Sequence, residues 1–333
     1  MNEKLKIALI GTGGWAREHG RILQGRADVD FCAVVGRNPE RTAVRAAQYG
    51  TTPYTDIQAM LAAQKPDLVC VCLPNQHHFE ATLQLLEAGV PLLVEKPLVF
   101  EMEQANALLE AAKKRDLFFA INFNHRYAKP LQLAKDAIEG GKLGEIIFAT
   151  WRFGGEGSSD HPHANLIETQ CHAFDQLEWL CGPIESIAAQ MTDLTGQGFS
   201  TLALSLRFAS GAVGSLLGTY DSSYAYRDTQ RIEINGTKGR VLIEDTVRRF
   251  EFQSAGDEIA QTWQAGYFND HDREFHRTFD RHMDAVLTAF RAGQKPPVGA
   301  WWGKRALQLA LAAIESHETG RRVGVPQTRE AHQ

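Results

Sequence analysis

The sequence has 333 residues, of which 44% are hydrophobic and 23% are charged, a composition typical of a folded globular protein. This length predicts two domains, each large enough to bury a core of its own. The formal net charge is -5 and the two signs are interspersed, so the chain has no basic face for nucleic acid or for an anionic membrane.

The five cysteines, at positions 32, 70, 72, 171 and 181, form no CxxC pair and are odd in number, which indicates reduced thiols. The chain enters a strand-like run directly after its first residues, so we expect no signal peptide. No apolar stretch approaches the roughly 18 residues that a membrane span requires. We therefore expect a soluble, cytoplasmic protein.

Residues 5–10 form a short apolar run that leads into a glycine-rich turn. A turn of this kind between a strand and a helix lets the backbone approach a pyrophosphate at the helix N-terminus. Gly11 and Gly13 occupy the first two glycine positions of the dinucleotide fingerprint, and Ala16 occupies the third. The predicted cofactor contacts in this turn are Gly11, Thr12, Gly13, Gly14, Trp15 and Ala16.

A second strand is expected over residues 29–35, and it closes a βαβ unit. Where an NAD-binding unit usually carries an acidic residue, this chain has Gly36, Arg37 and Asn38. An arginine at this place can pair with a ribose 2′-phosphate, so we predict NADP as the cofactor, with NAD possible. The alternative is an exposed arginine in a turn and use of both cofactors.

Residues 67–73 are predicted to form a buried parallel strand that ends in Leu73, Pro74 and Asn75, with His78 close behind. Because ligands bind at the carboxyl edge of such sheets, these residues are expected to contact the cofactor or the substrate. Asn75 and His78 can instead cap the helix that follows over residues 79–88.

The next apolar run, residues 90–94, ends in Glu95, Lys96 and Pro97. Proline restricts the residue before it, so Lys96 is held at the sheet edge, where its amine can hydrogen-bond a substrate oxygen. Glu95 and Lys96 are also predicted cofactor contacts; the alternative is a surface salt bridge. A helix over 101–115 and a strand over 117–121 continue the alternation and imply a doubly wound parallel sheet.

The glycine turn, the Leu-Pro-Asn-x-x-His stretch and Glu95-Lys96-Pro97, in this order and spacing, resemble the Gfo/Idh/MocA oxidoreductases. The resemblance covers essentially the whole chain. It implies an N-terminal Rossmann domain (residues 1–124) and a C-terminal α+β domain (125–333) with an open, mainly antiparallel sheet. It also implies that Lys96 is a catalytic or substrate-binding residue.

The second half of the chain is rich in predicted strands, at residues 145–153, 184–192, 199–208, 212–220, 231–235 and 240–245. Adjacent strands joined by tight turns favour an antiparallel sheet. The second face of this sheet requires cover, and a second copy of the chain can provide it. We therefore predict a homo-oligomer, a dimer or a tetramer.

Between the first two of these strands, a helix over residues 166–180 would place Glu168 and His172 on one face, with Asp175 beside the histidine. A histidine bonded to a carboxylate suits a general base near neutral pH. The family resemblance assigns the histidine role to His172 and the acidic role to Glu168, where many relatives carry aspartate. Arg126 is predicted to contact the substrate.

Three other interpretations of this stretch are weaker. His161, His163, Glu168 and His172 show no recognised zinc spacing, so we expect no metal. Cys171 points away from His172 if both lie on a helix, which disfavours a thiol nucleophile. The apolar stripe over residues 272–292 predicts a core helix.

Together these features predict an NAD(P)-dependent oxidoreductase that transfers a hydride between the nicotinamide and a hydroxyl-bearing carbon of a sugar, polyol or related substrate. His172 would accept the hydroxyl proton and Lys96 would hydrogen-bond the same oxygen. Two alternatives are a redox-neutral glycoside hydrolase or lyase on the same scaffold and a non-enzymatic dinucleotide-binding regulator. The scaffold alone does not decide among them.

Overall fold

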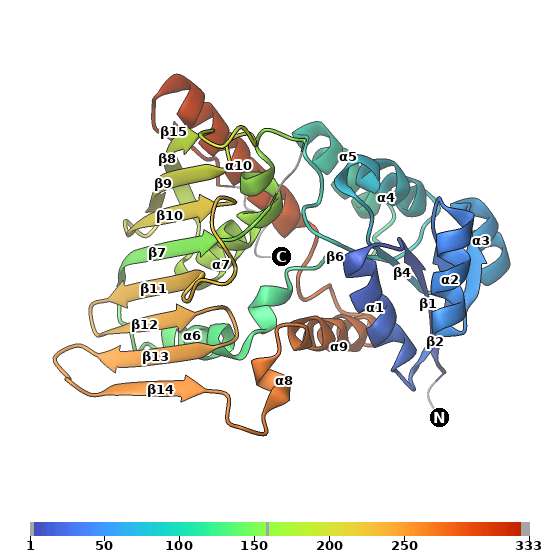
Figure 1. The fold of residues 1–333 in the computed structure, drawn as a ribbon, viewed down its shortest axis with the longest axis horizontal. Helices are drawn as coiled ribbons and strands as arrows, with labels where there is room; N and C mark the ends of the chain where they lie inside the picture. Colours follow the sequence, from blue (N-terminus) through green and yellow to red (C-terminus); the bar gives the residue numbers. More distant parts are fainter. Residues whose placement is uncertain (1–2, 158–159, 328–333) are drawn as a thin grey trace. The chain divides into compact units, whose positions relative to one another are not determined.

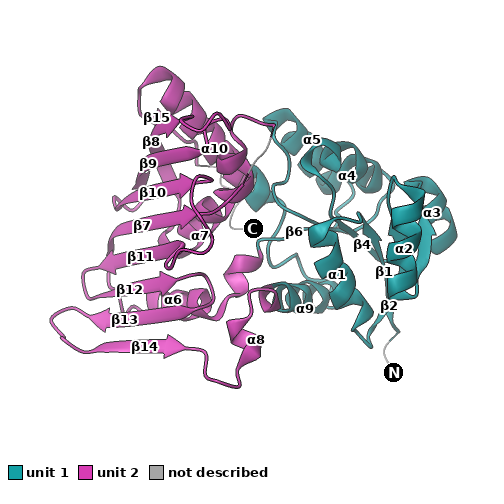
Figure 2. Ribbon diagram, in the orientation of Figure 1, with its two compact units in different colours: residues 1–123, 279–304 teal, residues 124–278, 305–333 magenta. Residues whose placement is uncertain are grey.

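A computed structural model describes residues 3–157 and 160–327 of the chain. The chain divides into two compact units (Figure 2): unit 1 comprises residues 1–123 and 279–304, and unit 2 comprises residues 124–278 and 305–333. Among the described residues, no helix combines the length and the apolar character needed to cross a bilayer.

Unit 1 is built on a six-stranded parallel sheet with the strand order β3-β2-β1-β4-β5-β6. This is the doubly wound Rossmann order. The strands are β1 (Leu5–Ile10), β2 (Val29–Val35), β3 (Thr52–Tyr54), β4 (Leu68–Val71), β5 (Leu92–Val94) and β6 (Phe119–Ile121). The intervening helices are α1 (Gly14–Gln24), α2 (Pro39–Tyr49), α3 (Ile57–Gln64), the short η1 (Asn75–His77), α4 (His78–Glu87) and α5 (Met102–Lys114).

The local sequence explains where these elements begin and end. All residues of β4, β5 and β6 are buried, as expected for strands of a parallel sheet covered on both faces. Helix α2 begins with Asn38, whose side chain accepts a hydrogen bond from the Arg41 amide, and it ends at Gly50 in the left-handed conformation. The Asn38 cap fixes the turn that follows β2 at the carboxyl edge of the sheet.

Residues 279–304 belong to unit 1, although the sequence analysis assigned all of 125–333 to the second domain. They comprise most of α9 (Arg277–Arg291) and the chain up to the start of α10 (Trp301–Thr319). Ile121 donates its amide to the Val298 carbonyl and Ala300 donates to Phe119, so this segment bonds the outer strand of the parallel sheet. The Phe290 ring meets Phe118 edge-on at 5.2 Å, which buries the apolar stripe of α9 against unit 1.

Unit 2 contains a nine-stranded mixed sheet with the order β14-β13-β12-β11-β7-β10-β9-β8-β15 (Figure 1). All neighbouring pairs are antiparallel except β10 and β7, which are parallel. The strands are β7 (Ile146–Gly154), β8 (Ile184–Thr192), β9 (Thr201–Phe208), β10 (Val213–Thr219), β11 (Gln230–Gly236), β12 (Gly239–Glu244), β13 (Arg249–Ser254), β14 (Ala260–Gln264) and β15 (Val323–Gly324).

Helices of unit 2 pack on this sheet: α6 (Lys129–Glu139) contacts β12 and β13, and α7 (Cys171–Cys181) contacts β7. Burial alternates along β9, where Leu202, Leu204, Leu206 and Phe208 are buried and the residues between them are exposed. One face of the sheet therefore forms the core of the unit, as the alternation in the sequence predicted.

Three elements differ from the expectations. The predicted helix over 272–292 is divided into α8 (Asp270–Arg273) and α9, because the chain extends at Glu274. Strands β13 and β14 were not predicted. The predicted helix over 166–180 consists of a π-helix, η3 (Asn165–Thr169), followed by α7, so its geometry changes between Glu168 and His172.

Candidate cofactor and substrate sites

The glycine turn joins β1 to α1 in unit 1. Gly11 has a φ of 122°, and a side chain there would place Cβ 2.1 Å from the Cys72 carbonyl oxygen, so only glycine fits. Added Cβ atoms at Gly13 and Gly14 would meet nothing within 4 Å, and no side chain caps the N-terminus of α1. The backbone amides at this end can therefore receive an anion, which fits the pyrophosphate of a dinucleotide.

Other residues of the turn have clear structural positions. Ala16 is buried, and its Cβ lies close to Gly11, as expected where a small residue lets helix and strand pack together. Thr12 is buried, whereas the Trp15 ring is 46% exposed and stacks on Phe279 at a centroid distance of 5.3 Å.

At the end of β2, Gly36 lies so close to Thr42 and Thr12 that a Cβ would approach the Thr42 hydroxyl to 2.5 Å. The Arg37 side chain is exposed at this turn. Asn38 caps α2, and this role accounts for its position independently of any ligand. The contribution of Arg37 and Asn38 to cofactor binding stays a prediction.

The segment after β4 carries Leu73, Pro74, Asn75 and His78. Leu73 and Asn75 are half-buried and Pro74 is exposed. His78 is buried, and its Nδ1 lies 2.9 Å from the Leu98 carbonyl, which can only accept, so the ring donates from Nδ1. Burial lowers the pKa of His78 and keeps the imidazole neutral. The ring thus supports the chain that follows Lys96-Pro97, a role that the sequence did not indicate.

Glu95 and Lys96 follow β5 at the same carboxyl edge. Lys96 is half-buried, and the Lys96–Pro97 peptide bond is cis. Glu95 is buried, and its Oε1 accepts hydrogen bonds from His19 Nε2 and Asn122 Nδ2, both at 2.7 Å. Burial alone would raise the pKa of Glu95, but these two donors and the Lys96 charge outweigh it and hold the pKa below its usual value. The group is a carboxylate at neutral pH.

In unit 2, Glu168 lies in the π-helix and His172 lies in the first turn of α7. Glu168 is half-buried. The next residue, Thr169, shares a 2.8 Å hydrogen bond with the hydroxyl of Tyr220, whose pKa is raised by burial. Single π-helical turns are frequent at functional sites, and Tyr220 is a neighbour of Glu168 that the sequence did not reveal.

His172 is buried, and its ring stacks on His125 with a centroid distance of 3.8 Å and an interplanar angle of 9°. The side-chain nitrogen of Gln176 lies 3.1 Å from Nδ1 of His125 and donates to the His172 carbonyl at 3.0 Å. Neither His125 nor Gln176 was singled out in the sequence, because 47 residues separate His125 from His172.

The expectation that Asp175 would serve His172 is corrected by the structure, because Asp175 pairs with Arg126. Nε and Nη2 of Arg126 donate to both carboxylate oxygens at 2.6–3.1 Å, and both side chains are buried. Burial raises the pKa of Asp175, and the Arg126 charge opposes that rise. Arg126 thus has a structural role, and its contact with substrate stays a prediction.

Of the histidines considered as metal ligands, His163 stacks on Phe199 at 4.9 Å and desolvation lowers its pKa. Within the described residues, the acid, histidine and cysteine side chains close enough to share an ion are His19, Cys72 and Glu95. The His19–Glu95 hydrogen bond already uses one atom of each, and burial raises the pKa of the Cys72 thiol well above its ordinary value.

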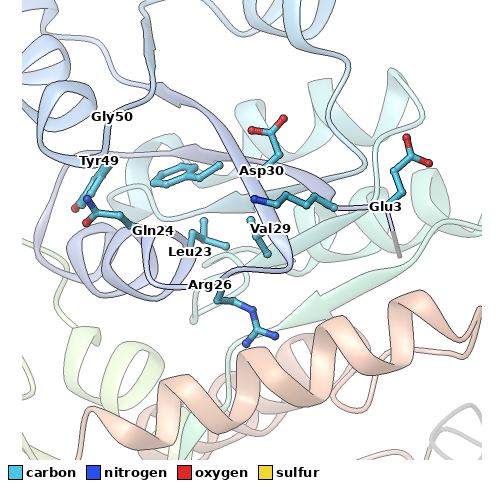
Figure 3. Close-up of a pocket in the computed structure, with 10 residues that line it drawn as sticks. Glu3, Leu23, Gln24, Arg26, Val29, Asp30, Tyr49 and Gly50 are labelled. Carbon is cyan, nitrogen blue, oxygen red and sulfur yellow. The ribbon is translucent and has the colours of Figure 1, made fainter. Parts of the chain in front are cut away.

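A groove of about 550 Å³ lies at the opposite edge of the unit 1 sheet, where β1 and β2 begin (Figure 3). Arg26 on its rim is held by Asp28 and by Asp284 of α9. The groove is lined by Glu3, Lys4, Leu23, Gln24, Arg26, Val29, Asp30, Phe31, Tyr49 and Gly50. Because it is at the amino edge of the strands, it is separate from the predicted cofactor residues.

Three features of unit 1 define a dinucleotide-binding oxidoreductase. They are a parallel sheet of this strand order, a turn in which only glycine fits at position 11, and a lysine at the same edge of the sheet. Two family models match the chain: "Oxidoreductase family, NAD-binding Rossmann fold" over residues 5–123 and "Oxidoreductase family, C-terminal alpha/beta domain" over residues 135–325. The chain belongs to the Gfo/Idh/MocA oxidoreductase family.

Individual relatives agree with this assignment. The chain is 38% identical to the D-glucoside 3-dehydrogenase of Escherichia coli over 150 residues, a match that covers 44% of this chain and 43% of that protein. It is 24% identical to the inositol 2-dehydrogenase of Rhizobium meliloti over 340 residues, which cover 96% and 99% of the two chains. The structure of levoglucosan dehydrogenase in complex with NADH has the same fold, with a TM-score of 0.88, 21% identity and coverage of 98% of this chain and 100% of that one.

The Arg126–Asp175 pair generates a prediction about stability. Arg126→Ala should lower the free energy of unfolding by about 3–5 kcal/mol, because it leaves a buried carboxylate without its guanidinium. Arg152→Ala is the matched control, since Arg152 pairs with Asp228 in the same unit but is largely exposed, and its loss should cost less than about 1 kcal/mol. Urea denaturation followed by circular dichroism measures both; equal small losses would contradict the prediction.

Proposed function

We propose that the chain is an NAD(P)-dependent dehydrogenase that acts on a hydroxyl-bearing carbon of a sugar, a polyol or a related substrate. The observation that carries the proposal is Lys96, a half-buried lysine at the same strand edge as the glycine turn and adjacent to an ionised Glu95. The names of relatives support the substrate class, since a D-glucoside dehydrogenase and an inositol dehydrogenase are among them.

The residues proposed to hold the dinucleotide are those of the glycine turn, Arg37 and Asn38 after β2, and the chain after β4. A bound nicotinamide would supply the acceptor or donor of the hydride. The open space at Gly13 and Gly14 and the uncapped N-terminus of α1 support this placement.

Three side chains are proposed to act on the substrate. Lys96 hydrogen-bonds the reacting oxygen as charge develops on it, and His172 accepts the hydroxyl proton. Glu168 binds a neighbouring hydroxyl or orients the substrate. Glutamate is longer than the aspartate that the family resemblance implies at this place, so the hydroxyl pattern it selects is expected to differ.

The proposal is tested by nicotinamide absorbance at 340 nm with NADP and then with NAD, across polyols, aldoses, inositols and sugar acids. Turnover of any of these compounds supports a dehydrogenase. Tight cofactor binding without an absorbance change across the panel would contradict it and favour a redox-neutral enzyme or a regulator.

Lys96→Met is expected to reduce kcat by about 100-fold or more, because the reacting oxygen loses its charged donor. The Kd for reduced cofactor, measured by fluorescence titration, should stay within about threefold, since the methionine leaves the glycine turn intact. Lys295→Met, at an exposed lysine of the same unit, is the control and should retain full turnover. Near-normal turnover in the Lys96 variant would remove this lysine from the mechanism.

A preference for NADP is proposed from Arg37, whose exposed guanidinium can pair with a 2′-phosphate. Arg37→Ala should weaken NADP binding by about tenfold or more and leave NAD binding nearly unchanged, because only NADP carries the extra phosphate. Arg41→Ala, an exposed arginine on the following helix, is the control. Equal losses for both cofactors would contradict the 2′-phosphate contact.

We further propose a homo-oligomer, a dimer or tetramer, in a cytoplasmic location. Val213 and Leu217 on β10 are 55% and 44% exposed and share one face of the strand, which a second copy can cover. The five cysteines, all within the described residues, are buried thiols, as is usual in a reducing compartment.

The chain mass is 37.0 kDa, so light scattering after gel filtration should give two or four times this mass. Leu217→Lys should raise the monomer fraction, because it places a charge in the covered face. Arg322→Lys, which keeps the charge of an exposed residue, should leave the mass unchanged. A wild-type mass of one chain would contradict the oligomer.

A further inference from the structure

Four buried polar side chains of unit 1 form a continuous hydrogen-bonded network. His19 of α1 bonds Glu95, which bonds Asn122 after β6, and Asn122 Oδ1 lies 2.5 Å from Nδ1 of His282 in α9. These side chains are between 1% and 5% exposed. The network therefore connects elements from four separate parts of the chain next to Lys96.

The direction of each hydrogen bond follows from the chemistry of the groups. An ionised carboxylate can only accept, so both His19 Nε2 and the Asn122 amide nitrogen donate to Glu95. Because the nitrogen of Asn122 faces Glu95, its oxygen faces His282, and His282 must donate from Nδ1. His19 and Asn122 thus stabilise the charged form of Glu95 directly, and His282 fixes the orientation of the Asn122 amide.

Glu95 connects the network to the neighbouring residue, Lys96. Its second oxygen, Oε2, accepts the backbone amide of Lys96 at 3.2 Å, and the Lys96 charge contributes to the lowered pKa of Glu95. With Oε1 fixed by two donors, the carboxylate cannot rotate away from the lysine. Loss of the His19 donor would leave Oε1 with the Asn122 amide alone, so the carboxylate could turn and move the negative charge that Lys96 experiences.

We propose that His19, Asn122 and His282 are positioning residues that act on Lys96 through Glu95, and that Glu95 is an anchor for the lysine and not a contact of the cofactor. The inference rests on the proposed function, because it concerns the lysine assigned to the reacting oxygen. Misplacement of a reacting group by about 1 Å can reduce a rate by about 100-fold.

The test compares two substitutions of His19 that differ in one donor. His19→Leu removes the hydrogen bond to Glu95, whereas His19→Gln has an amide that can donate from nearly the same place as Nε2. Thr82→Val is the matched control, since Thr82 is buried in unit 1 and lies outside the network. His19→Leu should lower kcat by about 10- to 100-fold with the cofactor Kd within about twofold, and His19→Gln and Thr82→Val should stay within about threefold of the unmodified chain.

A second measurement reports on Lys96 without catalysis. Reductive methylation with ¹³C-formaldehyde labels the lysine amines, and the Lys96 resonance is assigned by its absence in Lys96→Arg. This resonance should move in His19→Leu and in Glu95→Gln and remain in place in His19→Gln and Thr82→Val. If this resonance responds as expected but the unmodified chain turns over no substrate, the proposed function is refuted and the positioning role of the network is supported.

Three outcomes would overturn the proposal. The first is a Lys96 resonance that does not respond to His19→Leu, and the second is a His19→Gln variant as impaired as His19→Leu. The third is a Lys96 resonance in the unmodified chain that shifts on treatment with a zinc chelator, which would make His19, Cys72 and Glu95 a metal site.

Discussion

The structure of unit 1 depends on keeping one carboxylate charged inside its core. Glu95 is buried at the end of a central strand, where an uncompensated charge would cost several kcal/mol, and two short hydrogen bonds and a neighbouring lysine compensate it. Its donors come from the first helix and from the chain after the last strand of the sheet. Hydrogen bonds thus link the Glu95 carboxylate to the helix after the glycine turn, to Lys96 and, through Asn122, to helix α9. The residues that stabilise the core of unit 1 are therefore also those that surround the lysine proposed to act on the substrate.

The same constraint explains why residues 279–304 return to the dinucleotide-binding unit. Asn122 donates to Glu95, and the oxygen of the same buried amide, which would cost free energy without a partner, accepts from His282. Apolar contacts act in the same direction, since Phe279 packs on Trp15 and on His19. A helix that is distant in sequence thus completes both the polar network and the apolar cover of α1.

Features that depend on local sequence could be predicted, and features that depend on distant partners could not. The glycine turn, the strand ends at Lys96 and the alternation along β9 follow from residues within a few positions of one another. His19, one of the two donors to Glu95, lies 76 residues away from it in the sequence. Asp175 pairs with Arg126 at a separation of 49 residues, whereas helical spacing had suggested His172 as its neighbour. The π-helix around Glu168 is likewise invisible to a pattern of period 3.6. Strands β13 and β14 were missed because charged and polar residues dominate them.

The sequence contains twelve histidines and does not show which of their ring nitrogens donate or accept hydrogen bonds. The hydrogen-bond partners in the structure show this for individual rings. The His172 carbonyl only accepts, so the group of Gln176 that faces it is the amide nitrogen. The same nitrogen faces Nδ1 of His125, which must then accept and carry no proton. Because His125 stacks on His172 at 3.8 Å, the Gln176 amide that holds the His125 ring also fixes the surface against which the His172 ring packs. His125 and Gln176 thus hold the orientation of His172, the histidine that we propose as the base.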